Sequence, residues 1–359
     1  MDTILAAASR ALGHPLSDPV DLGGGSRSTV VRCRTPNGAT VVVKAYGDTA
    51  HSIGGFTAEA SALAFGLAGP ELLAVDRDFP LVVLADLGPW PTLADVLLGD
   101  DAETARDGVL AWAAGLGDLG ARAHGRRAEL AELRTRYDRG EPGWDSDPWL
   151  LTSIRKLPGT LTAAGVTPPP GLDADLVDIG ALTGDAYPVF TPGDTCADNN
   201  VLTPDGLRLL DFEGAGYVSA FLTAAYARMP FSSCWCVFRL PPDLARRAED
   251  TYRAALVLGY PELADDSVWG PGVRRAVAAW TLAVTAGLLP SALAADRPMH
   301  PRRPSPTARQ LLTHRWGLLA DELTAAGELP AVAATVGTLL ELTKEWDAPA
   351  LGLFPAFGG

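Results

Sequence analysis

Strand-like and helix-like segments occupy different parts of this chain. Residues 20–85 hold five short apolar or alternating runs bounded by turn residues, whereas most of the chain after residue 91 has the length and composition of helices. Sequences that separate strands from helices in this way are typical of α+β folds, in which a small sheet packs against helices. The 359 residues suffice for one large or two modest domains.

The predicted strands and their turns form a consistent order. Three glycines, Gly23 to Gly25, separate the first two strands, and Asn37-Gly38 supplies the positive φ of a tight hairpin before the third. A helix over 56–67 and two further strands follow. The predicted strands are 20–23, 29–34, 40–46, 72–75 and 81–84.

The rest of the chain is predicted to be mainly helical. Short strand-like runs over 187–191, 200–203 and 207–210 interrupt it. The longest apolar stretch, 276–295, is broken by Pro290, which favours a buried core helix over a membrane span. Helices are predicted near 92–98, 102–124, 172–182, 219–228, 241–258, 273–289, 308–326 and 329–344.

Charge and cysteine content restrict the partners and the compartment. A net charge of −14 disfavours nucleic acids and anionic membrane surfaces, because both attract cationic proteins. The chain has four cysteines, too few for a disulfide framework, and Cys234-Trp235-Cys236 has poor spacing for a zinc knuckle or a redox CxxC motif. We therefore expect buried free thiols in a cytoplasmic protein without an export signal.

A lysine lies within the apolar strand 40–46. The chain has only three lysines, at 44, 156 and 344, so Lys44 is conspicuous in this setting. A buried ammonium group is destabilising unless it is paired, and Glu59 in the next helix is the candidate partner. The alternative is an edge strand whose lysine extends into solvent.

The glycine-rich segment 23–28 lies between the first two strands. Its glycines allow the backbone to approach an anion closely, and Ser26 and Ser28 add hydroxyl donors. It is not a P-loop, because no Gly-Lys-Ser/Thr follows and the next element is a strand. Taken alone, the segment could equally be a flexible turn.

Polar residues cluster in two neighbouring segments, 192–202 and 209–213. Asn199 and Asp211 lie on either side of a predicted hairpin, which would bring their oxygens together as ligands for Mg²⁺. Asp194 would lie beside them and could accept the proton of an attacking hydroxyl group. The alternative reading is that these are ordinary turn-forming residues.

In this order the motifs resemble those of the aminoglycoside phosphotransferase and choline kinase group, relatives of protein kinases. The resemblance covers nearly the whole chain, from the glycine-rich loop through the hinge at 84–88 to Asp211. It implies a two-lobed kinase-like fold. The N-lobe, over 1–86, would be a small antiparallel sheet with one main helix, and the C-lobe, over 87–359, would be larger and mostly helical.

The resemblance also implies residue roles. Asp194 would position the acceptor hydroxyl group, and Asn199 and Asp211 would bind Mg²⁺. The residues implied for the nucleotide are Gly24, Gly25, Ser26, Ser28, Lys44, Glu59, Ala85 and Leu87. Three positions depart from the family pattern: Pro192 replaces the usual His, Ala85 replaces a common acidic residue, and Asn200 is a second candidate beside Asn199.

The expected function is ATP- and Mg²⁺-dependent phosphorylation of a hydroxyl group on a small molecule, such as an aminoglycoside or another antibiotic. GTP in place of ATP is left open. The alternatives are a kinase of a metabolite (an amino alcohol, sugar or nucleoside) and a nucleotide-binding pseudokinase that regulates a partner.

The acceptor-binding candidates are Asp198, Glu213 and Trp235. Carboxylates not used by Mg²⁺ or Lys44 would favour a cationic acceptor, whereas the apolar segment 229–238 could instead line a pocket for a neutral one. The basic, proline-rich connector 296–306 is expected to be solvated rather than part of the site.

Overall fold

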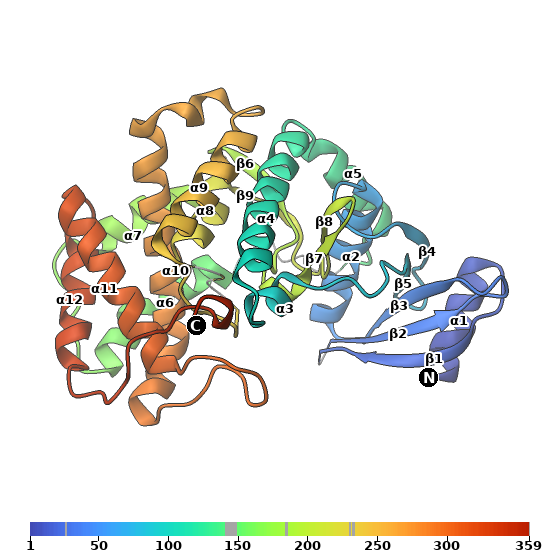
Figure 1. Cartoon of the computed structure of the whole chain (residues 1–359), viewed down its shortest axis with the longest axis horizontal. Coiled ribbons are helices and arrows are strands. Elements are labelled where there is room, and N and C mark those ends of the chain that lie inside the picture. Colours follow the sequence, from blue (N-terminus) through green and yellow to red (C-terminus); the bar gives the residue numbers. More distant parts are fainter. Residues whose placement is uncertain (26, 141–148, 184–185, 230, 232–233, 359) are drawn as a thin grey trace.

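The computed structural model describes residues 1–25, 27–140, 149–183, 186–229, 231 and 234–358. A five-stranded antiparallel sheet with the order β1-β2-β3-β5-β4 lies at one end of the molecule, and helices make up most of the rest (Figure 1). The strands are β1 (Ser17–Gly23), β2 (Ser28–Arg34), β3 (Thr40–Tyr46), β4 (Leu72–Asp76) and β5 (Leu81–Ala85). The predicted α+β, two-lobed architecture is confirmed, and the lobe boundary at residue 86 remains a prediction.

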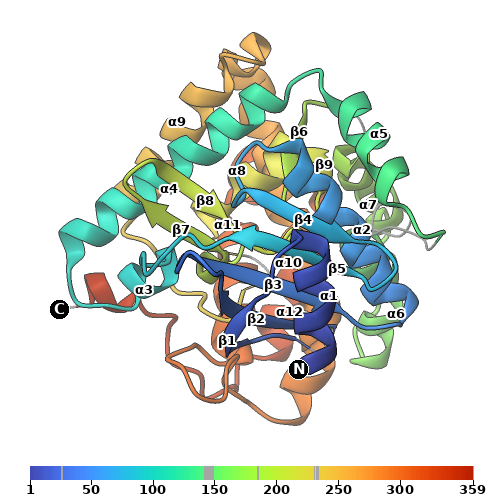
Figure 2. The same cartoon turned by 90° about the vertical axis from the view of Figure 1, so that its right-hand side faces the viewer.

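Two helices cover the two faces of the sheet. Helix α1 (Asp2–Leu12) packs Ala7 and Ala8 against strand residues such as Val43, and Figure 2 looks onto this helix with the strands behind it. Helix α2 (Ala50–Phe65) belongs to the larger core, which joins the other face of the sheet to the helical part. Side chains alternate along a strand, so neighbouring residues of β3 face different helices.

Helix α2 begins six residues before the predicted start at residue 56. The prediction followed the apolar positions from Phe56 onward, and the pair Gly54-Gly55 before them has low helix propensity. Thr49 caps the helix instead, its side chain accepting a hydrogen bond from the backbone N–H of Ser52. Gly54 and Gly55 are buried, so packing outweighs propensity here.

The helical part contains two helices that the sequence did not predict, α5 and α6. Helix α5 buries only Leu130, so it lacks a periodic apolar face, and α6 contains Pro158. The helices are α3 (Leu93–Leu97), α4 (Ala102–Ala123), α5 (Arg127–Tyr137), α6 (Trp149–Ala163), α7 (Leu172–Gly180), α8 (Ala220–Arg228), α9 (Pro242–Leu256), α10 (Asp266–Ala294), α11 (Ala308–Ala326) and α12 (Pro330–Leu342).

Helix α10 is the central helix of this part. It is long and apolar enough to cross a membrane by composition, but 67% of its most apolar window is buried inside the protein. Its Trp280 donates a hydrogen bond to the carbonyl of Leu222 at 2.9 Å. The predicted core helix is confirmed, although it extends through both Pro271 and Pro290.

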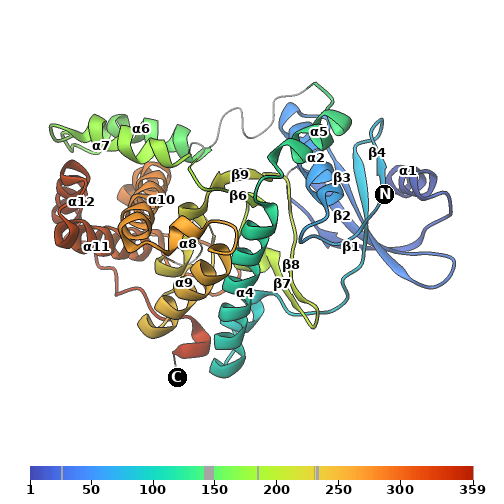
Figure 3. The same cartoon turned by 90° about the horizontal axis from the view of Figure 1, so that it is seen from above.

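Two small hairpin-like sheets lie between the large sheet and helices α8 to α12 (Figure 3). Strand β6 (Pro188–Thr191) pairs with β9 (Gly216–Ser219), which was not predicted, and β7 (Asn200–Thr203) pairs with β8 (Gly206–Leu209). The loop from β6 to β7 and the loop from β8 to β9 therefore both connect one small sheet to the other. These two loops carry the predicted catalytic and metal-binding residues.

Residues 352–354, near the end of the sequence, form backbone hydrogen bonds with Arg239. The backbone N–H of Arg239 donates to the carbonyl of Gly352, and the N–H of Phe354 donates to the carbonyl of Arg239. The fully buried ring of Phe354 also packs against Phe231 and Phe238. The segment 231–239 is thus held by residues more than a hundred positions later.

Candidate active site

Strand β3 directs Lys44 toward helix α2. Val41, Val43 and Ala45 pack in the core beneath α1, so the alternating residues Lys44 and Tyr46 face the opposite side. There the Lys44 ammonium group donates to Glu59 at 2.5 Å. Lys44 is 7% exposed, so the predicted ion pair is confirmed and the edge-strand alternative is wrong.

Lys44 contacts two more carboxylates. Its Nζ lies 2.8 Å from Asp211 Oδ1 and 3.1 Å from Glu213 Oε1. Burial alone would lower the pKa of Lys44, but the three carboxylates outweigh burial and hold its pKa above the ordinary value. Tyr46 further satisfies Glu59, donating its hydroxyl hydrogen to Oε2 at 2.5 Å. The cluster therefore consists of the charged ammonium group of Lys44 and the carboxylates that surround it.

The glycine-rich loop closes over this cluster. Gly24 has φ 155°, and a Cβ there would lie 2.3 Å from the carbonyl oxygen of Ser28, so a side chain is excluded at that position. Gly25 has no such close neighbour, and Ser26 lies outside the described residues. The Ser28 hydroxyl donates to Glu213 at 3.4 Å. The loop therefore reaches the turn that follows Asp211.

Arg27 of the same loop was not singled out from the sequence. Its Nε lies 2.7 Å from Glu213 Oε2, and its Nη1 lies 3.0 Å from His51 Nε2. Glu213 is 5% exposed and is held by both Lys44 and Arg27. This position differs from the expectation that Glu213 lies beside the acceptor, because its carboxylate is already engaged beneath the glycine-rich loop.

The hinge begins where β5 ends. The N–H of Ala85 is taken by the carbonyl of Glu71, whereas the N–H of Leu87 has no partner among the described residues. Between them, Asp86 pairs with Arg32 at 2.7 Å and accepts the N–H of Gly88. Burial would raise the pKa of Asp86, but the hydrogen bonds from Gly88 and Arg32 outweigh it and the pKa is lowered. This ionised carboxylate fixes the hinge between its two predicted contact points.

Asp194 lies in a tightly constrained loop after β6. Gly193 has φ 94°, and a Cβ there would lie 2.4 Å from the backbone of Gly214. The Gly193 N–H also donates to Thr191 Oγ1 at 3.2 Å. These contacts brace the loop directly after Pro192.

Asp194 is among the exposed residues of this loop, although protein atoms crowd around its carboxylate. Burial raises its pKa, and the nearby charges of Asp211 and Asp198 act in the same direction against the hydrogen bond from the Cys196 N–H. A carboxylate with a raised pKa is a better proton acceptor at neutral pH than an ordinary one.

The two neighbouring asparagines point to different surroundings. Asn199 lines a pocket, whereas Asn200 is fully buried and donates to the carbonyls of Cys196 at 2.6 Å and Thr195 at 3.3 Å. Asn200 therefore shapes the loop, and Asn199 is the one that reaches the site. This geometry agrees with the preference for Asn199 from spacing.

The pocket has a volume of about 410 Å³. Asp211 enters it from a left-handed backbone conformation with φ 59°, which an aspartate tolerates better than most residues. The lining residues are Asp194, Cys196, Asp198, Asn199, Asp211, Cys234, Trp235 and Met299. The structure thus brings the predicted catalytic and metal-binding side chains to one cavity.

The oxygen donors of this pocket fit Mg²⁺. A magnesium ion takes one or two protein carboxylates and completes its shell with water and phosphate oxygens. Asp211 and Asn199 offer such donors at the cavity wall, whereas Glu59 and Glu213 are buried and do not line the pocket. A magnesium ion held here would neutralise negative charge on the phosphates.

Trp235 and Asp198 form one wall of the pocket. The indole N–H of Trp235 donates to Asp198 Oδ2 at 3.0 Å, so both predicted acceptor-side residues lie together. The connector 296–306 also participates, contrary to expectation. Met299 lines the pocket, and His300 and Arg303 pack on the Trp235 ring at 4.9 and 5.0 Å.

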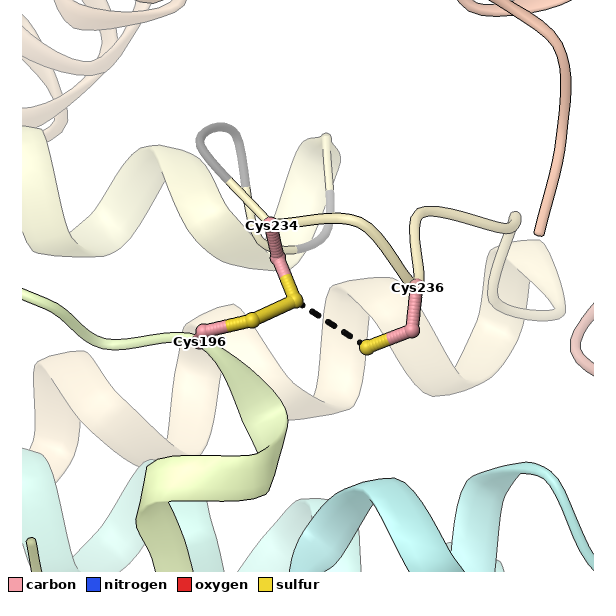
Figure 4. Close-up of side chains that lie close together, drawn as sticks. All are labelled: Cys196, Cys234 and Cys236. Carbon is pink, nitrogen blue, oxygen red and sulfur yellow. Dashed lines mark hydrogen bonds between the residues drawn. A yellow bond between two sulfur atoms is a disulfide. The ribbon is translucent and has the colours of Figure 1, made fainter. Parts of the chain in front are cut away.

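The cysteines differ from the expected free thiols. Cys196 and Cys234 form a disulfide with a Cα–Cα distance of 5.0 Å, and Cys236 lies beside it with its Sγ 3.1 Å from that of Cys234 (Figure 4). Cys33 and Cys236 are free, as predicted. Sequence spacing could not reveal the third cysteine, because the fold brings Cys196 to the pair from a separate loop.

Solved structures with the same architecture include two phosphotransferases. Choline kinase from Cryptosporidium parvum Iowa II matches with a TM-score of 0.53 and 14% identity, covering 87% of this chain and 91% of its own. APH(2")-IIia, solved as a complex with GDP and kanamycin, matches with a TM-score of 0.50 and 12% identity, covering 89% and 98%. The chain has the protein-kinase-like fold. The resemblance inferred from the motifs is confirmed at the level of the fold, while no family model and no curated protein matches the sequence.

Proposed function

We propose that this protein is a cytoplasmic, ATP-dependent phosphotransferase that uses Mg²⁺ to phosphorylate a hydroxyl group of a small cationic molecule. The observation that supports this most is the junction at Asp211, which pairs with the buried Lys44 and also opens onto the pocket that holds Asp194. Phosphoryl transfer depends mainly on positioning and charge stabilisation. The fixed ammonium group of Lys44 next to an oxygen-lined pocket can supply both the positioning and the charge stabilisation.

The nucleotide would lie between the glycine-rich loop and the hinge. Lys44, oriented by Glu59, would contact the α- and β-phosphates, and the constrained backbone at Gly24 would lie over them. At the hinge, the N–H of Leu87 would donate to the purine and the carbonyl of Ala85 would accept from it. The GDP in the APH(2")-IIia structure keeps GTP as an alternative donor.

Asp194 would accept the proton of the acceptor hydroxyl group. Its raised pKa and its place on the pocket wall support this role, while Asn199 and Asp211 would hold Mg²⁺. In the same pocket Asp194 would therefore act on the acceptor, and not on the metal.

A cationic acceptor is supported by the charge of the pocket. Three carboxylates line it, from Asp194, Asp198 and Asp211, and only Asp211 pairs with a lysine in the described structure. The Trp235 ring adds an aromatic wall, which can contact an ammonium group through its π-face. Choline and kanamycin, named for the two proteins of the same fold, both combine positive charge with hydroxyl groups.

Phosphate transfer from ATP to a panel of amino alcohols and aminoglycosides, with and without Mg²⁺, tests the proposal. Turnover of at least one acceptor should depend on Mg²⁺ and fall by about 10²–10³-fold in Asp211→Asn, the scale for loss of a preorganised electrostatic contact. If ATP binds and no acceptor of the panel is turned over, a cationic acceptor is contradicted, and sugars and nucleosides are tested next to separate a metabolite kinase from a pseudokinase. Turnover that Asp211→Asn leaves unchanged would remove the metal assignment.

A further inference from the structure

Three buried cysteine sulfurs meet at the back of the acceptor pocket. The side chains of Cys196, Cys234 and Cys236 are 6%, 2% and 0% exposed, and their sulfur atoms lie within 4.8 Å of one another. Figure 4 shows the side chains converging from two separate segments of the chain. A disulfide uses only two of them, so the position of Cys236 needs another explanation.

Thiol–disulfide exchange would join Cys236 to only one of the other two sulfur atoms at a time. A metal cation can engage all three sulfur atoms at once, because a coordinating thiol loses its proton to the solvent and binds as a thiolate.

The positions of the three cysteines suit a common metal ion. Cys234 and Cys236 are two positions apart in an irregular segment without an assigned strand or helix, and both point toward Cys196. A tetrahedral zinc site with Zn–S bonds of about 2.3 Å needs sulfur atoms roughly 3.8 Å apart. The three sulfur atoms lie within 4.8 Å of one another, so small side-chain movements reach this spacing once the bond between Cys196 and Cys234 is broken.

We propose that Cys196, Cys234 and Cys236 in their reduced form bind one thiophilic divalent metal ion, with Zn²⁺ as the reference case. A dithiol reductant first breaks the bond between Cys196 and Cys234 and is itself oxidised to a disulfide. The three thiols then release their protons as the sulfur–metal bonds form. The fourth coordination position faces the pocket that Cys196 and Cys234 line, where water or a further donor completes the shell.

This site would fasten the loop of Asp194 to the segment that carries Trp235. Cys196 lies two residues after Asp194, and Cys234 and Cys236 flank Trp235 directly. One ion would therefore hold both the proposed base and the aromatic wall of the pocket. It is distinct from the oxygen-rich Mg²⁺ site, because soft thiolates select zinc and related ions over magnesium.

Titration of the reduced full-length protein with Co²⁺ tests the proposal without any measurement of phosphotransfer. Protein reduced with a dithiol, freed of reductant without air and shown to contain four free thiols is titrated in excess Mg²⁺, which occupies the oxygen site. We expect one Co²⁺ per chain, a thiolate-to-cobalt charge-transfer band and the visible bands of a tetrahedral site, all removed by Zn²⁺. Reduced protein that binds no Co²⁺, or binds it without the charge-transfer band, would overturn the proposal.

Matched cysteine variants assign the ligands. Cys196→Ser and Cys236→Ser should each weaken Co²⁺ binding by about 100-fold or more, since loss of an outer-shell partner alone costs up to about that much. Cys33→Ala, in the core between the sheet and α1, should bind like the parent chain. Unchanged Co²⁺ binding in Cys236→Ser would show that Cys236 is not a metal ligand, and would leave the cluster as a disulfide with a free thiol beside it.

A second measurement covers variants that fail to fold. Zn²⁺ should raise the melting temperature of the reduced parent protein, because an ion that binds only the folded state stabilises it. It should not do so for the oxidised protein, in which the disulfide blocks two ligands. Equal shifts in the two forms would contradict the proposal.

Discussion

Lys44 has more carboxylate partners than a single ammonium can neutralise. Two of them, Glu59 and Glu213, are almost fully buried, while Asp211 reaches the pocket. Breaking a buried ion pair from one side is strongly destabilising, because the remaining charge stays in a poorly solvated place. At this residue catalysis and stability therefore depend on the same contacts.

Replacing Lys44 with alanine should abolish phosphotransfer and lower the free energy of unfolding by about 3 kcal/mol or more. The sequence indicated a single partner, Glu59, whereas the structure shows three carboxylates around Lys44. Chemical denaturation measures the loss, with Lys344→Ala, an exposed lysine, as the control. The double variant Lys44→Met, Glu59→Gln should recover stability but no activity. Parent-like unfolding of Lys44→Ala would contradict the three-carboxylate account.

The ionised carboxylate of Asp194 lowers the stability of the folded protein, and its proposed role as a base explains why such a group is present. A carboxyl group whose pKa is raised on folding binds more protons in the native state than in the unfolded chain. Its contribution to stability is fully present below the unfolded pKa of about 3.9 and is lost as the pH rises through the folded pKa. The ionised form needed for catalysis is therefore the form that destabilises the fold.

Asp194→Asn should raise the melting temperature at pH 7 and have little effect near pH 3.5, where the parent carboxyl group is protonated in both states. Turnover should fall by about 10²–10⁴-fold, the range for loss of a general base. Nucleotide affinity should be nearly unchanged, since Asp194 is not assigned to the metal. A large loss of nucleotide affinity would make Asp194 a ligand rather than a base.

The two loops that carry the site contact each other in two places. Gly193 packs closely against the backbone of Gly214, and the N–H of Leu210 donates to the carbonyl of Asn199 at 2.8 Å. These contacts fix Asp194 relative to Asp211. The relative positions of Asp194 and Asp211 thus depend on the contacts between the two loops, and not on the sequence of either loop alone.

Gly193→Ala should abolish turnover and destabilise the protein more than Gly206→Ala does. Both glycines have positive φ, 94° and 105°, so both substitutions strain the backbone. Only at Gly193 would the new Cβ also collide with backbone, since nothing lies within 4 Å of the same position at Gly206. Thermal unfolding and turnover of the two variants distinguish the effect of backbone strain, which both share, from the effect of the collision with Gly214. Equal effects would show that the contact with Gly214 is unimportant.

The elements that sequence reasoning predicted well have local signatures. The strand around Lys44 follows from its run of valines, and the hairpin from Asn199 to Asp211 follows from turn residues close in sequence. Helix α5 was missed because it buries one residue, and β9 because four residues give too little pattern. Apolar spacing placed the start of α2 too late, because packing against the core extends the helix through two glycines.

The site was predictable only where its residues belong to recognised motifs. Arg27, which pairs with Glu213, and Met299, in the pocket wall, join it through contacts between segments far apart in the chain. No pattern within either segment indicates such a contact. The same reason hid the meeting of Cys196 with Cys234 and Cys236.

At the scale of the whole molecule, charge should govern acceptor choice. The net charge of −14 and the carboxylates of the pocket both attract cations, and salt screens such attraction. For a cationic acceptor, kcat/KM should fall as ionic strength rises, whereas for a neutral acceptor of similar size it should not change. If only the neutral compound is turned over, and its turnover does not depend on salt, the electrostatic account of acceptor choice is wrong. The assignment of the fold would not be affected.

The pairing of residues 352–354 with Arg239 imposes an order on biosynthesis. The sheet and α1 draw only on residues before 90 and can begin to form early on the ribosome, since domains tend to fold as they emerge. The segment that carries Trp235 must wait for partners made more than a hundred residues later. A nascent chain could thus acquire its nucleotide-side sheet well before its acceptor wall. A translation arrest between these two points would release a polypeptide with half of its active site.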